Sequence, residues 1–155
     1  MRIEYFQLID EIVSIDPEEG VIRTRATVPD ESTIFEGHFP GHPLMPGVLL
    51  IESMAQTCGY LVLTANRFDA MPFLAGVREA KLRTFVEPGD VLDLEGFLEH
   101  DGSGYAMTTA KVTCAGKRIC DSKLTFKVMP FPTGDFSTLM RENAERLGYP
   151  MELLG

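Results

Sequence analysis

The feature that most constrains the fold is a long apolar segment, from Val48 to Phe68, that contains no proline. Apolar residues would occupy nearly every side of a helix formed by this segment, so protein must cover most of its circumference. Pro46 favours a helix start here, because the N–H groups of a first turn have no partner inside the helix. Its most apolar stretch, Val48 to Leu63, is interrupted by polar residues and is too short and too polar to span a bilayer. We therefore expect a central helix buried in a protein core.

The sequence on both sides of this segment alternates β-branched and aromatic residues with polar ones, which is typical of half-buried strands. The pattern predicts about six strands, two before the helix and four after it. Short connections such as 88–90 and 100–104 favour antiparallel neighbours. Such a sheet can bury one long helix only by curling around it. The predicted fold class is α+β, with a curved antiparallel sheet around one central helix.

The chain is expected to divide near residue 130. Residues 1–130 would form the strand and helix domain, and residues 131–155 a C-terminal extension that packs on its surface. The extension is first rich in proline and then carries a short helical pattern of Phe136, Leu139, Met140 and Leu147, followed by Gly148 and Pro150.

Charge and cysteine content exclude several classes of protein. The 23 acidic residues outnumber the 14 lysines and arginines, for a formal charge of −9, which disfavours nucleic-acid binding. Three cysteines without a C-x-x-C pair signal neither a disulfide framework nor a zinc knuckle. The first residues lack the features of a secretory signal. We expect a cytoplasmic protein with no membrane span.

The densest chemical signal lies between Phe35 and Gln56. Glycines and prolines restrict the loop around His38, whose neutral imidazole could act as a base. Glu52 follows among apolar neighbours, which favour an un-ionised carboxyl able to donate a proton. The N–H of Gly47, at the helix start, could hold a partially negative carbonyl oxygen. A base, an acid and an oxyanion donor are what elimination of water from a 3-hydroxyacyl thioester requires.

This segment reads FEGHFPGHPLMPGVLLIESMAQ. It resembles the motif of the FabZ-type 3-hydroxyacyl-[acyl-carrier-protein] dehydratases, F-x-G-H-F-P-x-x-P-x-x-P-G-V-L-x-x-E-x-x-A-Q, at every fixed position. The resemblance extends to about Met129. It implies the hotdog fold, catalysis by His38 and Glu52, an oxyanion donor at Gly47, and substrate contact by Phe39. It also implies a catalytic pair completed across a homodimer, or across a larger assembly of such dimers, without metal or organic cofactor.

The implied reaction converts (3R)-hydroxyacyl groups on acyl carrier protein to trans-2-enoyl groups, in fatty acid or lipid A acyl-chain synthesis. Glutamate rather than aspartate at position 52 is similar to the plain dehydratases, not to the bifunctional type that also isomerises the double bond. The opening RIEYFQLID and the C-terminal extension depart from the usual pattern. They are similar to a divergent branch associated with lipid A.

Several alternatives remain open at this point. Gln56 either orients Glu52 from position i+4 or is an ordinary polar interface residue. The cluster Arg78, Lys81 and Arg83 is either a solvated strand face or a docking patch for an acidic carrier protein. An acyl-thioesterase, with Glu52 activating water, and a non-catalytic acyl or carrier-protein binding module are the rival functions.

Two smaller expectations concern single residues. His42 is interpreted as a loop residue rather than a metal ligand, because the intervening Phe39, Pro40 and Gly41 block the helical geometry that would bring its ring to His38. Apolar side chains after the helix are expected in the core, namely Phe73, Leu74, Phe85 and Phe97.

Overall fold

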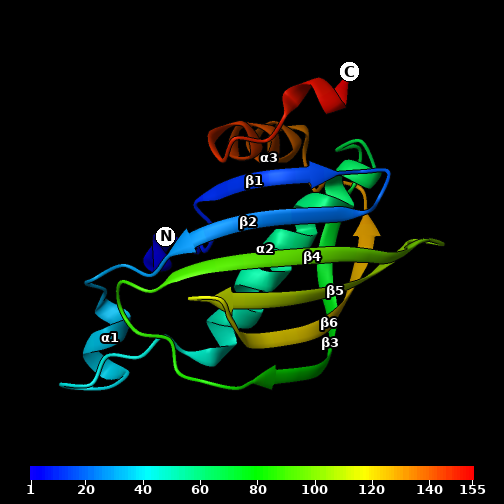
Figure 1. Ribbon diagram of the computed structural model, residues 1–155. Helices are drawn as coiled ribbons and strands as arrows, with labels where there is room; N and C mark the ends of the chain where they lie inside the picture. The colour runs from blue at the N-terminus through cyan, green and yellow to red at the C-terminus, as the bar shows by residue number, and fades with distance from the viewer.

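The computed structural model describes residues 1–155 and shows a six-stranded sheet curled around helix α2 (Gly47–Ala65) (Figure 1). The strands lie in the spatial order β1 (Glu11–Asp16), β2 (Val21–Thr27), β4 (Val91–Gly102), β5 (Tyr105–Cys114), β6 (Lys117–Met129) and β3 (Met71–Leu82). All five neighbouring pairs are antiparallel. The predicted α+β architecture is therefore confirmed.

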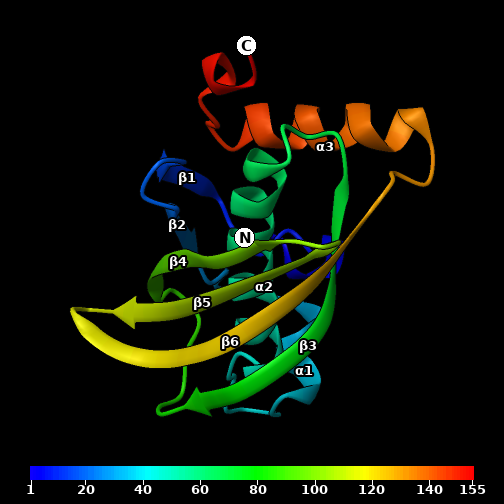
Figure 2. The same ribbon diagram turned by 90° about the vertical axis from the view of Figure 1, so that its right-hand side faces the viewer.

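Shorter elements complete the chain. They are the 3-10 turns η1 (Ile3–Tyr5) and η2 (Met151–Leu154), the short helix α1 (Thr33–Gly37) and the helix α3 (Gly134–Arg146). Figure 2 shows α2 inside the curve of the sheet and α3 lying across the end where α2 stops.

Helix α2 lies close against β4 at Gly96. A Cβ atom added there would lie 2.9 Å from Cys58 Sγ and 3.0 Å from Ile22 Cγ2. Real Cβ atoms rarely come so close to another heavy atom, so this glycine lets the helix lie against the middle of the sheet.

By length and composition alone α2 could cross a membrane, so the prediction that it is too short and too polar is wrong on those criteria. The prediction that protein buries it is confirmed, because 56% of its most apolar stretch is buried inside the fold. This is the arrangement of the core helix of a globular domain.

Two hydrophobic clusters follow one another along α2. The first surrounds the N-terminal half of the helix, where Leu50 and Met54 are packed by the sheet. The second surrounds the C-terminal half and includes Ala144, Leu147 and Tyr149 from the extension.

Hydrogen bonds tie the extension to the rest of the chain. The Tyr149 hydroxyl lies 2.9 Å from Thr64 Oγ1, and the Ile12 N–H donates to the Leu147 carbonyl at 2.7 Å. Leu139, expected on the apolar face of α3, is instead 47% exposed. Met140 and Leu147 do pack against the domain, as the helical pattern predicts, so Leu139 is the residue of the pattern that departs from it.

The edge strand β3 leaves apolar side chains uncovered. Phe73, Leu74, Val77 and Leu82 are all exposed, and Phe85 in the following loop is 78% exposed. The expectation that Phe73, Leu74 and Phe85 lie in the core is wrong for a single chain, because no further strand pairs beyond β3. A long free edge flanked by exposed apolar residues is a surface suited to pairing with another chain.

Candidate active site

His38 is fixed by the backbone on both of its sides. It caps the C-terminal end of α1, where its N–H donates to the Ile34 carbonyl at 3.0 Å, and its own carbonyl accepts from the Leu44 N–H at 2.9 Å. Between these points the backbones of Phe39 and His42 exchange hydrogen bonds of 3.0 and 2.8 Å. The loop rich in glycine and proline therefore holds the imidazole in one place, as its composition predicts.

One contact decides which nitrogen of His38 carries the proton. Its Nδ1 lies 2.8 Å from the carbonyl oxygen of Leu44. A carbonyl oxygen can only accept, so Nδ1 must donate. In the neutral ring Nε2 then has a free lone pair, as a general base requires.

His38 lines a cavity, here called the His38 cavity, that the first turn of α2 also borders. Its lining includes His38, Phe39, Gly47, Leu50 and Phe85. The ring of Phe39 stacks on that of His38 with centroids 4.1 Å apart. Gly47 is the first residue of α2, so its N–H has no partner within the helix and can bind an oxygen atom.

Gly47 also lies close to β3. A Cβ atom at this position would meet the flexible end of the Leu82 side chain, which would have to move aside. With glycine here, Leu82 rests against the first turn of α2 while that turn stays open to the cavity.

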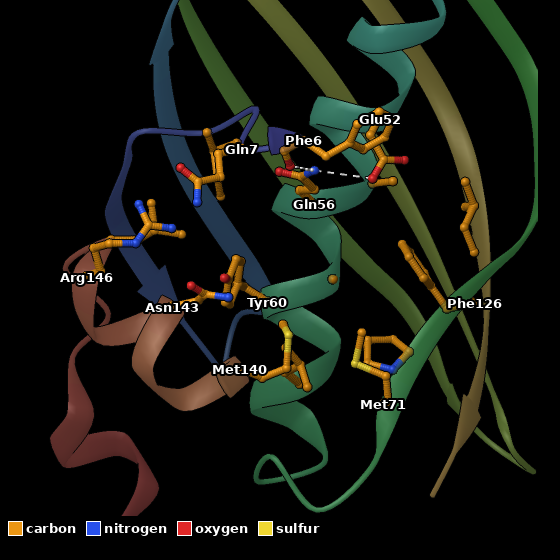
Figure 3. A pocket seen from close by; sticks show the side chains of 17 residues that line it. Phe6, Gln7, Glu52, Gln56, Tyr60, Met71, Phe126, Met140, Asn143 and Arg146 are labelled. Atoms are coloured by element: carbon orange, nitrogen blue, oxygen red, sulfur yellow. Dashed lines mark hydrogen bonds between the residues drawn. The ribbon is translucent and has the colours of Figure 1, made fainter. Parts of the chain in front are cut away.

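Glu52 lines a different cavity of the same chain. It is about 140° around α2 from Gly47, because five residues make roughly 1.4 turns of an α-helix. This Glu52 cavity is lined also by Gln56, Tyr60, Phe126 and Met140, as Figure 3 shows. Glu52 is half-buried, and none of the six ion pairs of the chain includes it. No lysine or arginine of the same chain therefore lies within ion-pair distance of this carboxyl.

Gln56 connects Glu52 to the N-terminal segment. Its Nε2 donates to Glu52 Oε1 at 3.3 Å and to the Phe6 carbonyl at 2.8 Å (Figure 3). Its Oε1 accepts from the Leu8 N–H at 3.1 Å. The i+4 contact expected from the sequence is present. The same amide also holds the N-terminal segment against α2, so both alternatives proposed for it have a structural basis.

Two ionisable side chains of α2 are buried and neutral, and one of them, Tyr60, lines the Glu52 cavity. Burial raises the pKa of Tyr60, in the wall of the Glu52 cavity, to about 12. The positive charge of the nearby Arg146 lowers this pKa, but by less than burial raises it. Burial likewise raises the pKa of the Cys58 thiol to about 12. Neither group is charged near neutral pH, and Cys58 is the packing residue that its helical position suggests.

The residues singled out from the sequence thus fall into two groups. His38, Phe39 and Gly47 share one cavity, whereas Glu52 and Gln56 share the other. None of the five main cavities of the single chain is lined by both His38 and Glu52.

Sequence reasoning missed part of the Glu52 cavity, namely the contribution of α3. Met140, Asn143 and Arg146 come from this helix (Figure 3). Residues of α2 and α3 that are far apart in the sequence line this cavity together, and the spacing of residues within either helix does not reveal that.

The basic residues proposed for docking lie together on the outside. Arg78, Lys81 and Arg83 are all exposed, along β3 and just after it. Arg83 pairs with Asp121, while Arg78 and Lys81 form no ion pair. Two positive charges are therefore free to meet an acidic partner.

The antiparallel sheet closed around one helix, with a rigid histidine loop at the helix start, defines a hotdog-fold protein. The chain belongs to the FabA-like domain family, which matches residues 2–123. It is 39% identical over 120 residues to the 3-hydroxyacyl-[acyl-carrier-protein] dehydratase FabZ of Latilactobacillus sakei subsp. sakei (strain 23K), covering 77% of this chain and 85% of that protein. It is 40% identical over 127 residues to the FabZ of Enterococcus faecalis (strain ATCC 700802 / V583), covering 80% and 84%.

Similarity to a solved structure supports the fold alone. The dehydratase heterocomplex ApeI:P from Xenorhabdus doucetiae matches with a TM-score of 0.64 at 19% identity, over 86% of this chain and 90% of that chain. Together, the family match and the relatives confirm the resemblance of the chain to the FabZ-type dehydratases.

Proposed function

We propose that the protein removes water from (3R)-3-hydroxyacyl groups carried by acyl carrier protein and releases the trans-2-enoyl thioester. Membership of the FabZ-type family supports this activity. The observation that carries the mechanism is the hydrogen bond from His38 Nδ1 to the Leu44 carbonyl, which leaves Nε2 as the base.

In the proposed mechanism His38 Nε2 takes the proton from C2 of the acyl chain. The electron pair left on C2 forms the C2–C3 double bond as the C3–O bond breaks, and Glu52 protonates the departing hydroxyl, which leaves as water. The Gly47 N–H stabilises the negative charge that develops on the thioester oxygen. His38 is then protonated and Glu52 ionised, so one proton must return from His38 to Glu52, directly or through solvent, before the next cycle.

The proposed site is shared between two chains, with His38 of one protomer facing Glu52 of the partner subunit. The two cavities of a single chain support this arrangement, because each holds only part of the machinery. Both cavities also border β3, since Leu82 of this strand lines the His38 cavity and Leu74 lines the Glu52 cavity. A second copy paired along the free edge of β3 would therefore lie over both of them.

The partner and setting are proposed from charge and sequence. Arg78, Lys81 and Arg83 lie close to the exposed edge of β3 and are the proposed docking surface for an acidic carrier protein. We place the protein in the cytoplasm, in fatty acid synthesis or, from its divergent opening and its extension, in lipid A acyl-chain synthesis.

A turnover assay over a series of 3-hydroxyacyl carrier-protein substrates tests the activity. Formation of enoyl absorbance without free thiol supports dehydration, whereas thiol release would establish the thioesterase instead. Binding without turnover at any length would establish a non-catalytic module.

Variants test the assigned residues in the same assay. His38→Ala and Glu52→Gln are each expected to lower kcat by about 10²–10⁴-fold, the usual contribution of a general acid or base. His42→Ala, in the same loop but exposed, is the matched control and should keep normal turnover. Ordinary turnover by His38→Ala would reject the mechanism.

A further inference from the structure

The Glu52 cavity is elongated along α2. Its lining residues on this helix recur at helical spacing from Glu52 through Gln56, Gly59 and Tyr60 to Leu63. Eleven residues of α-helix rise by about 16 Å, so the cavity extends well beyond the carboxyl group. Figure 3 shows Glu52 and Gln56 toward one end and Met71 and Met140 toward the other.

The walls suit an unbranched hydrocarbon. Apolar side chains from four elements face the cavity, among them Ala55, Leu63, Met71, Leu74 and Phe126. A substrate whose C3 hydroxyl meets Glu52 has its acyl chain continuing past C3. This cavity is the apolar space that begins at that point.

Helix α3 closes the far end. Met140, Asn143 and Leu147 lie at positions i, i+3 and i+7, so one stripe of this helix faces the cavity. Met140 is half-buried and packs against the second hydrophobic cluster, and its flexible thioether can fit an irregular chain end. Asn143 and Arg146 add polar groups to the side wall of the cavity, near Tyr60 (Figure 3).

We infer that α3 sets the acyl-chain length accepted by the protein, with Met140 as the residue that limits it. This inference rests on the proposed function, because it takes the acyl chain of that reaction as the occupant. The FabA-like family match ends at residue 123, before α3 begins at Gly134. The length limit is therefore a property of the extension rather than of the shared domain.

The test compares Met140→Ala, Met140→Trp and the control Leu139→Ala. Leu139 is the neighbouring residue and is exposed, so its replacement should leave length preference unchanged. Met140→Ala should raise kcat/KM for chains just beyond the wild-type limit by about fourfold per additional buried methylene. Met140→Trp should lower kcat/KM at least tenfold for the longest accepted chains and leave short chains unaffected.

A second readout does not depend on catalysis. The melting temperature of each full-length variant is measured with saturated acyl-pantetheine thioesters of the same lengths, which lack the hydroxyl and cannot be dehydrated. If the wild type turns over no substrate but Met140→Ala still binds longer chains than the wild type, the proposed activity fails and the inference stands. If the length limit in binding is the same in Met140→Ala, Met140→Trp and wild type, the inference is overturned whatever the turnover.

Discussion

Mixing two inactive variants is the sharpest test of how the site is assembled. His38→Ala lacks the proposed base and keeps Glu52, while Glu52→Gln keeps the base and lacks the acid. Because His38 and Glu52 line different cavities of one chain, a site shared by two chains can be restored in a mixed dimer. One of its two sites then receives both native residues, and the other receives neither.

The expected recovery follows from two-fold symmetry. Random exchange between equal amounts of the two variants makes half of the dimers mixed, and half of their sites are intact, so activity should reach about one quarter of wild type. Mixed dimers purified through two different affinity tags should reach about one half.

The assay is the initial rate of enoyl formation after coexpression or after subunit exchange under mild denaturant. Mixing His38→Ala with the double variant carrying both substitutions is the control, because no site in that mixture has a histidine. A mixture no more active than the sum of its parents, with mixed dimers shown to be present, would refute the shared site.

Three further predictions concern packing, pH and the free edge. Gly96→Ala should lower the free energy of unfolding by about 1–3 kcal/mol in denaturant titrations, because its Cβ would press on Cys58. Gly76→Ala, whose Cβ meets Thr125 at an ordinary 3.6 Å, should change it much less. Burial raises the pKa of Tyr60 from 10.0 to about 12, so the unfolded chain loses this proton first and the stabilisation present below pH 10 declines as the pH rises to about 12. Tyr60→Phe should remove that part of the decline, and an unchanged pH profile would contradict it. Val77→Lys on β3 should yield monomers in sedimentation experiments, whereas Val13→Lys on the opposite edge strand should not.

The central helix and the strands could be predicted because their signals are local. A proline-free apolar run from Val48 to Phe68 and alternating segments around it specify the elements, and short turns specify antiparallel neighbours. The histidine loop was likewise predictable, since the glycines and prolines around His38 leave few backbone shapes. The contacts that these residues make with distant parts of the chain could not be predicted in the same way.

The errors in the sequence reading share a physical cause. Phe85 has the hydrophobicity of a core residue, yet it is 78% exposed in one chain. Sequence alone does not distinguish burial within a chain from burial against another chain. In α3, Leu139 belongs to the predicted helical pattern but faces solvent, while the less conspicuous Ala144 is fully buried. The rotation of a short helix on a domain surface depends on its tertiary partners, which local spacing does not encode.

The packing of Ala144, Leu147 and Tyr149 against Ile9 and Phe68 has a practical consequence. The stretch shared with the family stops at residue 123, and a protein engineer guided by that boundary would cut the chain there. Such a trimmed protein would lose the last part of β6 and all of the extension. The hydrophobic cluster around the C-terminal half of α2 would then be exposed to solvent. We expect it to aggregate on expression, so a soluble minimal version must run at least to Tyr149.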